Sequence, residues 1–299
     1  MYNFVYTYEN MPKWTDTAEG AEILEIDQNV LYPSLYPPVT FAVKNDYQLH
    51  IRFIFPEGRD LDRKYPLIIH VKGSGWEEQN LENCLAGFEP YLRAGYGCAV
   101  VQYRPWRVAK YPAQVLDLKT AARYILKNAA DYPIDVSNIF LSGDSSGGHT
   151  AIMGFLTWGE PVLDDLQESD PLPALRGLID YYGVTNVHKL AYTETGLVQP
   201  DNELLLDMLF EKRDESEYAQ ANFACYSDLL EQLPPVLIMH GNKDRLVSLD
   251  QSIDLYNTLK ARGVDCQLCI VNNADHGRFS FWQKPVTDRV LEFLKKNTR

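Results

Sequence analysis

The residue pattern with the clearest chemical meaning lies near the middle of the chain, where residues 143–147 read G-D-S-S-G. This G-x-S-x-G pattern follows an apolar stretch and precedes a stretch compatible with a helix. In that setting the glycines permit a sharp turn that presents the central serine as a nucleophile. Ser145 is therefore the predicted nucleophile, and the Ser146 amide, at a helix N-terminus, is a predicted oxyanion donor. A plain Gly/Ser-rich turn is the alternative interpretation.

A serine nucleophile needs a histidine to accept its proton and a carboxylate to orient that histidine. Asp244 follows the apolar segment 235–240 and is the predicted carboxylate, whereas Asp250 is better placed to cap the next helix. His276 follows in a polar loop after another apolar segment, with Gly277 beside it. It is the predicted base, and a solvated loop histidine is the alternative.

A small-residue loop, residues 72–76 with the sequence K-G-S-G-W, follows an earlier apolar segment. Its small residues let a backbone amide approach a substrate oxygen, so the amide of Ser74 or Gly75 is the predicted second oxyanion donor. Trp76 is a predicted substrate contact, although packing in the core is an equal alternative.

The elements that must position these residues alternate between apolar, β-branched runs and helical patterns, which is typical of an α/β fold with a mostly parallel sheet. Strands are predicted at 47–55, 67–71, 98–103, 139–142, 178–182, 236–240 and 266–271. Helices are predicted at 81–93, 113–128, 146–156, 250–262 and 282–296.

Two regions depart from this alternation. Before residue 65, prolines and a period-two pattern predict antiparallel edge strands. Residues 185–233 interrupt the βα rhythm with short helix-like patches such as 204–210, and we expect a cap or lid insertion over one end of the sheet. The whole chain, 1–299, is expected to form one domain.

Composition narrows the function further. The net charge of −13 argues against nucleic acid or an anionic membrane surface as a partner and favours a neutral small-molecule substrate. The N-terminus lacks a signal-peptide pattern and the five cysteines are an odd number, so a cytoplasmic protein is expected. Cys266 and Cys269 form a lone C-x-x-C pair, for which ordinary strand positions are favoured over a metal or redox site. A homo-oligomer remains open.

Together these motifs resemble the bacterial carboxylesterase/lipase branch of the α/β-hydrolase family, which includes acetyl-sugar and feruloyl esterases. The resemblance covers residues 65–285 and includes Y-R-P at 103–105, Y-P-A-Q at 111–114 and Asp117, which it implies are structural. It implies an α/β-hydrolase fold and a serine carboxylesterase for short-chain or aryl acyl esters, or acylated carbohydrates, without metal or cofactor. The family loop is commonly H-G-G-G-W, so the role of Lys72 stays open.

Two other functions remain open at this point. An amidase or peptidase of the same fold, resembling arylformamidases or prolyl oligopeptidases, would use the same triad, although no propeller-sized N-terminal region is present for the latter. A noncatalytic binding protein is the third possibility, because the fold can persist without the chemistry.

Overall fold

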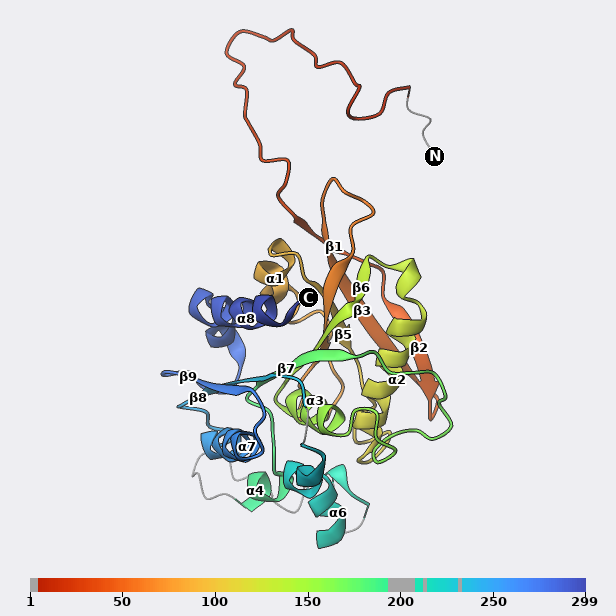
Figure 1. Cartoon of the computed structure of the whole chain (residues 1–299), viewed down its shortest axis with the longest axis vertical. Coiled ribbons are helices and arrows are strands. Elements are labelled where there is room, and N and C mark those ends of the chain that lie inside the picture. The colour runs from red at the N-terminus through yellow and green to blue at the C-terminus, as the bar shows by residue number, and fades with distance from the viewer. Residues whose placement is uncertain (1–4, 193–207, 212–213, 231–232) are drawn as a thin grey trace.

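The structure is a computed structural model, and it describes residues 5–192, 208–211, 214–230 and 233–299. Its centre is one nine-stranded sheet with the strand order β1-β3-β5-β4-β6-β7-β8-β9, and β2 also pairs with β3 (Figure 1). The strands are β1 (Tyr32–Leu35), β2 (Val39–Lys44), β3 (Tyr47–Glu57), β4 (Tyr65–Val71), β5 (Gly97–Val101), β6 (Ile134–Asp144), β7 (Leu175–Tyr181), β8 (Val236–Gly241) and β9 (Cys266–Val271).

Strand direction divides the sheet into two parts. The pairs of β3 with β1, β2 and β5 are antiparallel, as the pattern before residue 65 predicts. From β5 to β9 every pair is parallel. Because parallel strands end at a common edge, the loops after β4, β6, β8 and β9 meet there, which is where such folds place their sites.

Helices cover both faces of the sheet. One buried cluster contains residues of α2 (Ala113–Lys127), α3 (Ser146–Leu156) and α7 (Leu249–Ala261). A second cluster on the other face contains residues of α1 (Glu89–Arg93) and α8 (Lys284–Asn297) (Figure 1). The shorter elements are α4 (Val187–Tyr192), α6 (Glu215–Gln220) and the 3-10 turns η1 (Leu85–Phe88), η2 (Ala129–Asp131), η3 (Phe223–Leu229) and η4 (Arg278–Trp282).

The predicted helix at 81–93 is wrong in its first half. Only α1 is α-helical, and a 3-10 turn precedes it. Pro90 lies in the first turn of α1, which is where a residue without an N–H is tolerated. A β-carbon on Gly87 would overlap the Trp282 ring, so this segment is shaped by close packing as well as by local preference.

The segment between β7 and β8 contains α4, α6 and η3, as expected for an insertion. Part of the predicted patch at 204–210 lies outside the described residues, and a lid role for 185–233 stays a prediction. Within the described part of the chain, no helix is long and apolar enough to cross a membrane.

Candidate active site

The predicted nucleophile occupies a strained turn between β6 and α3. Ser145 has φ 55° and ψ −123°, a conformation that non-glycine residues rarely adopt and that is typical of functional sites. A β-carbon on Gly143 would overlap the Gly147 carbonyl, and one on Gly147 would overlap the Val71 carbonyl. Both glycines are therefore required by close backbone approach, as the G-x-S-x-G pattern predicts.

The structure brings the three predicted triad side chains into one hydrogen-bonded line. His276 Nε2 lies 2.8 Å from Ser145 Oγ, and His276 Nδ1 lies 2.7 Å from Asp244 Oδ2. The three residues come from the loops after β6, β8 and β9, at the common edge of the sheet. The Tyr182 ring packs edge-on against the imidazole, with 4.7 Å between ring centroids. Asp250, the alternative acid, instead lies in the first turn of α7 and pairs with Lys189.

Asp244 is fixed by four groups and held in its charged form. Its Oδ1 accepts hydrogen bonds from the amides of Leu246 and Val247, at 2.8 and 2.9 Å. Burial alone would raise the pKa of Asp244, but hydrogen bonds from His240 and His276 outweigh burial and hold that pKa well below its ordinary value. An ionised Asp244 accepts the Nδ1 proton of His276, which leaves His276 Nε2 free to accept the Ser145 proton.

His240 is a member of this site that sequence reasoning placed only at a strand end. Its side chain is fully buried, with Nε2 3.3 Å from Asp244 Oδ2 and 2.9 Å from the Val247 carbonyl. A carbonyl can only accept, so Nε2 bears the proton, and Nδ1, 2.6 Å from Ser252 Oγ, accepts from that hydroxyl. His240 thus supports the same carboxylate oxygen that His276 contacts. Its spacing of four residues before Asp244 was the signal available in the sequence.

Lys72 ties the small-residue loop to the nucleophile turn. Its Nζ lies 2.7 Å from Asp144 Oδ2, and the Gly73 amide donates to Asp144 Oδ1 at 2.7 Å. His70 Nε2 lies 3.2 Å from the same Oδ1. Burial opposes ionisation of Asp144, but His70 and the Lys72 charge hold the pKa of Asp144 well below its ordinary value. The Lys72 position, left open by the sequence, is therefore a largely buried cation that pairs with Asp144.

A second set of contacts joins the same two segments through hydroxyl groups. The Ser74 amide donates to Ser146 Oγ at 2.9 Å, and the Tyr103 hydroxyl lies 3.0 Å from both Ser146 Oγ and Ser74 Oγ. The Ser74 amide is therefore already engaged. Among the described residues, neither the Gly75 amide nor the Ser146 amide has a hydrogen-bond acceptor. Of the two amides predicted for the second oxyanion donor, Gly75 is the one that remains available.

Trp76 lies in the core rather than on an open surface. Only 2% of the residue is exposed, and its ring packs edge-on against His149, with 5.4 Å between centroids. The neighbouring Trp106 is half-buried and donates from Nε1 to Glu77 at 2.8 Å. Trp76 thus supports the loop that follows β4, and a direct contact with substrate stays a prediction.

Asp180 is a buried carboxyl group that the sequence did not single out. It lies near the C-terminal end of β7 and is 0% exposed. Its Oδ1 accepts a hydrogen bond from the Gly183 amide at 3.1 Å. Among the described residues Oδ2 has no partner. Burial raises the pKa of Asp180 to about 7, although His240 and the Gly183 amide act in the opposite direction. Asp180 packs against Gly148 of α3, directly behind the nucleophile turn.

The Y-R-P segment after β5 is structural, as the resemblance implies. Arg104 makes a buried, forked ion pair with Asp117 of α2, with hydrogen bonds from Nε and Nη2 at 2.8 Å. A planar guanidinium matches a carboxylate in this geometry. The pair fixes the loop after β5 to α2 and does not reach the triad.

Comparison with known proteins agrees with this architecture. Relatives in Mycobacterium tuberculosis include "Probable carboxylic ester hydrolase LipM" (24% identity over 67% of this chain and 46% of that protein) and "Esterase LipQ" (26% over 64% and 44%). The chain thus spans less than half of the length of these two relatives.

Solved structures show the fold. A truncated carbohydrate esterase from gut microbiota aligns with a TM-score of 0.73 at 23% identity, over 91% of this chain and 98% of that one. Esterase B from Lactobacillus rhamnosis aligns with a TM-score of 0.74 at 19% identity, over 90% and 87%. The predicted α/β-hydrolase fold is confirmed. The BD-FAE family model matches residues 54–259, which is more than half of the chain, and the protein therefore belongs to the BD-FAE family.

Proposed function

We propose that this protein is a serine carboxylesterase that hydrolyses short-chain or aryl acyl esters, including acyl esters of carbohydrates. The observation that supports this most directly is the continuous line from Ser145 Oγ through His276 to Asp244, at 2.8 and 2.7 Å. These distances are those at which a base can take the serine proton.

The acylation step follows from this geometry. Ser145 Oγ attacks the ester carbonyl carbon while His276 Nε2 takes its proton, and Asp244 stabilises the imidazolium that forms. The carbonyl oxygen becomes an oxyanion, which the amides of Ser146 and Gly75 stabilise. The C–O bond then breaks, and His276 returns the proton to the departing alcohol.

Deacylation reverses the same roles. Water donates a proton to His276 Nε2 as it attacks the acyl-enzyme carbonyl, and the second oxyanion occupies the same pair of amides. Collapse of this intermediate breaks the bond to Ser145 Oγ, which recovers its proton from His276. The products are the carboxylic acid and the free enzyme.

Several properties support esters as the substrate class. The relatives are named as ester hydrolases, and one structural neighbour is named as a carbohydrate esterase. The net charge of −13 favours neutral substrates over anions. All five cysteines are unpaired and Cys225 is exposed, which supports a reducing compartment such as the cytoplasm.

The test is hydrolysis of p-nitrophenyl esters of increasing acyl length by the wild type and by Ser145→Ala, His276→Ala and Asp244→Asn. We expect kcat/KM to fall by at least about 1,000-fold in each triad variant. Asp250→Asn, the matched control for Asp244→Asn, retains wild-type activity. Faster cleavage of anilides than of esters by the wild type would replace the proposal with an amidase.

A fluorophosphonate probe separates an enzyme from a binding protein. The wild type should be labelled at Ser145 and lose labelling in Ser145→Ala. A folded wild type that resists labelling and hydrolyses no ester would contradict the proposal and leave a noncatalytic protein of the same fold.

A further inference from the structure

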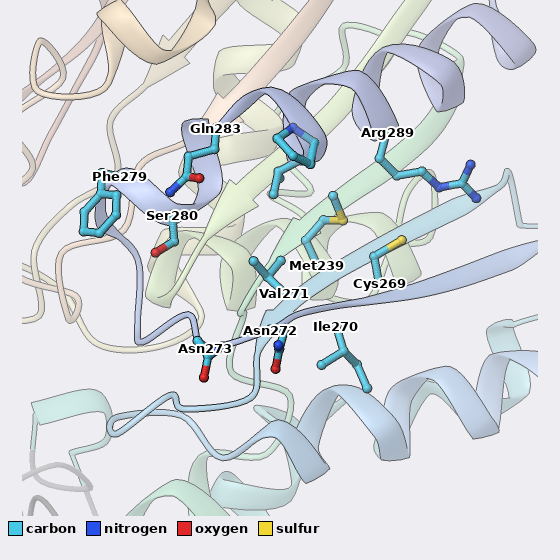
Figure 2. Close-up of a pocket in the computed structure, with 12 residues that line it drawn as sticks. Met239, Cys269, Ile270, Val271, Asn272, Asn273, Phe279, Ser280, Gln283 and Arg289 are labelled. Atoms are coloured by element: carbon cyan, nitrogen blue, oxygen red, sulfur yellow. The ribbon is translucent and has the colours of Figure 1, made fainter.

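A groove with a volume of about 630 Å³ lies between β9 and α8, and its lining includes Asn273 and Phe279, which flank His276 in the sequence (Figure 2). Its volume falls within the range of about 300–1,000 Å³ that is typical of small-molecule sites. Met239, Cys269 and Val271 contribute apolar groups from β8 and β9. The groove begins at the carboxyl end of β9, which is the edge of the sheet where the triad lies.

Neutral polar side chains line one end of the groove (Figure 2). Asn273, Ser280 and Gln283 are among the lining residues, and none of the three side chains has a hydrogen-bond partner within the described part of the chain. Amide and hydroxyl groups can each donate and accept hydrogen bonds. This end of the groove therefore offers a ligand solvent-accessible donors and acceptors that do not bind other groups of the protein.

An exposed aromatic ring stands at the same end. Phe279 lines the groove and is 74% exposed, and Figure 2 shows its ring beside Ser280 at the margin of the site. An exposed ring beside polar groups that the protein does not use can contact the apolar face of a ligand whose edges carry hydrogen-bonding groups.

The charges of the residues that line the groove argue against an ionic ligand. Of the described residues that line the groove, only Arg289 has a charged side chain, and it is paired with Glu292 and with the Gln267 side chain. The groove thus offers no uncommitted cation to an anionic ligand and no carboxylate to a cationic one. The net charge of −13 further disfavours anions.

A ligand that fits this lining is neutral, has hydroxyl groups along its edges and has apolar faces between them. A saccharide has all three properties, because the C–H groups of a sugar ring can lie on Phe279 while its hydroxyls reach Asn273, Ser280 and Gln283. We propose that the groove binds a neutral oligosaccharide, as a docking site for the carbohydrate part of the ester at a distance from the bond that is cleaved. The assignment to the ester's carbohydrate part rests on the proposed function.

The segment that bears the base connects the two sites. Asn273 precedes His276 by three residues and Phe279 follows it by three. A saccharide held by both residues spans the base of this loop and brings its attached acyl group toward the carboxyl end of the sheet. An ester of a groove-binding oligosaccharide should therefore have a lower KM than the same acyl group on a small alcohol.

The test uses the full-length Ser145→Ala protein, which binds without turnover. Titration calorimetry with xylohexaose and cellohexaose should give saturable binding, and hexagalacturonate, the anionic counterpart, should give none. A thiol reagent locates the site, because Cys269 lines the groove and Cys225 is exposed elsewhere. The neutral sugar should slow modification of Cys269, read by peptide mass spectrometry, and leave Cys225 unchanged.

Two substitutions complete the test. Phe279→Ala in the same background should weaken sugar binding about tenfold, and Gln283→Ala should weaken it several-fold. Leu61→Ala, which removes an equally exposed apolar side chain elsewhere, should not change the Kd. The proposal is overturned if neither neutral hexasaccharide binds, or if Phe279→Ala leaves the binding unchanged. Hydrolysis of p-nitrophenyl acetate by the wild type reports separately on the proposed esterase, so the two failures are distinguishable.

Discussion

Lys72 and Asp144 form a largely buried ion pair, with 2.7 Å between Nζ and Oδ2. Lys72 begins the loop predicted to offer the second oxyanion donor, and Asp144 directly precedes the predicted nucleophile. This contact, together with the hydrogen bonds of the Gly73 and Ser74 amides, holds the two segments of the predicted oxyanion site together. The family pattern that this loop resembles has histidine at the Lys72 position. In this chain a lysine ammonium group at that position contacts the Asp144 carboxylate.

Removing the Lys72 charge should cost both stability and rate. Lys72→Met leaves Asp144 as a buried carboxylate with less compensation, and we expect the free energy of unfolding to fall by about 3 kcal/mol. Urea unfolding measures this loss, and p-nitrophenyl acetate hydrolysis should show a lower kcat. Adding Asp144→Asn removes the buried charge, so the double variant should recover part of the stability. Equal stability of wild type and Lys72→Met would show that the pair is not needed.

The Tyr103 hydroxyl should affect kcat more than KM. Tyr103→Phe keeps the ring but removes the group that contacts Ser74 and Ser146, so the loop amide is held less accurately and kcat falls about tenfold. The matched control is Tyr91→Phe, which removes a buried hydroxyl 3.1 Å from that of Tyr181, away from the loop. Similar kinetics for both variants would contradict the assignment.

His240→Asn should change how the stability of the folded protein depends on pH in the acid range. His240 helps to hold the pKa of Asp244 below its ordinary value, so its loss raises that pKa. A depressed carboxyl pKa stabilises the fold above its unfolded value of about 4, and the stabilisation is lost as the pH falls below it. The variant should be less stable than wild type at pH 7, and the difference should shrink as the pH falls below about 4, through the raised pKa of Asp244 in the folded variant. Thermal unfolding across this range measures it, and a difference independent of pH would disprove the link.

The raised pKa of Asp180 should make stability depend on pH in the opposite direction to the lowered pKa of Asp244. Its pKa is raised to about 7, so the unfolded chain releases this proton near pH 4 while the folded protein keeps it. Stability should therefore decline as the pH rises from about 4 to 7, on the order of 1.4 kcal/mol per pH unit for this group. Asp180→Asn, which cannot ionise, should gain stability over wild type across this interval. The melting temperatures of both proteins are measured from pH 4 to 7, and a constant difference between them over this interval would refute the prediction.

The sequence predicts the elements whose signals are local and strong. The mostly apolar runs at 236–240 and 266–271 become β8 and β9 nearly residue for residue, and 146–156 becomes α3. The predicted helix at 81–93 is longer than the observed one because Gly87 packs closely against Trp282, which is distant in the sequence. Periodicity does not contain such information.

The residues of the candidate site also differ in how far the sequence predicts them. Ser145, Asp244 and His276 follow from chain order and from their places after strands, because parallel strands deliver their following loops to one edge. The partners of Lys72 and the support that His240 gives to Asp244 depend on which side chains meet across strands. So does the engagement of the Ser74 amide by Ser146 Oγ, which distinguishes Ser74 from Gly75. These are tertiary contacts, and apart from the four-residue spacing of His240 and Asp244 no spacing in the sequence indicates them.

The hydrogen bond between Ser145 and His276 joins residues 131 positions apart, and His276 follows the outermost strand, β9. A chain that has folded its central strands but has not yet added β8 and β9 has a nucleophile without acid or base. Such a partly folded or C-terminally cut chain should therefore be catalytically silent. Recovery of ester hydrolysis during refolding therefore reports the completion of the sheet edge, and not merely the collapse of its centre.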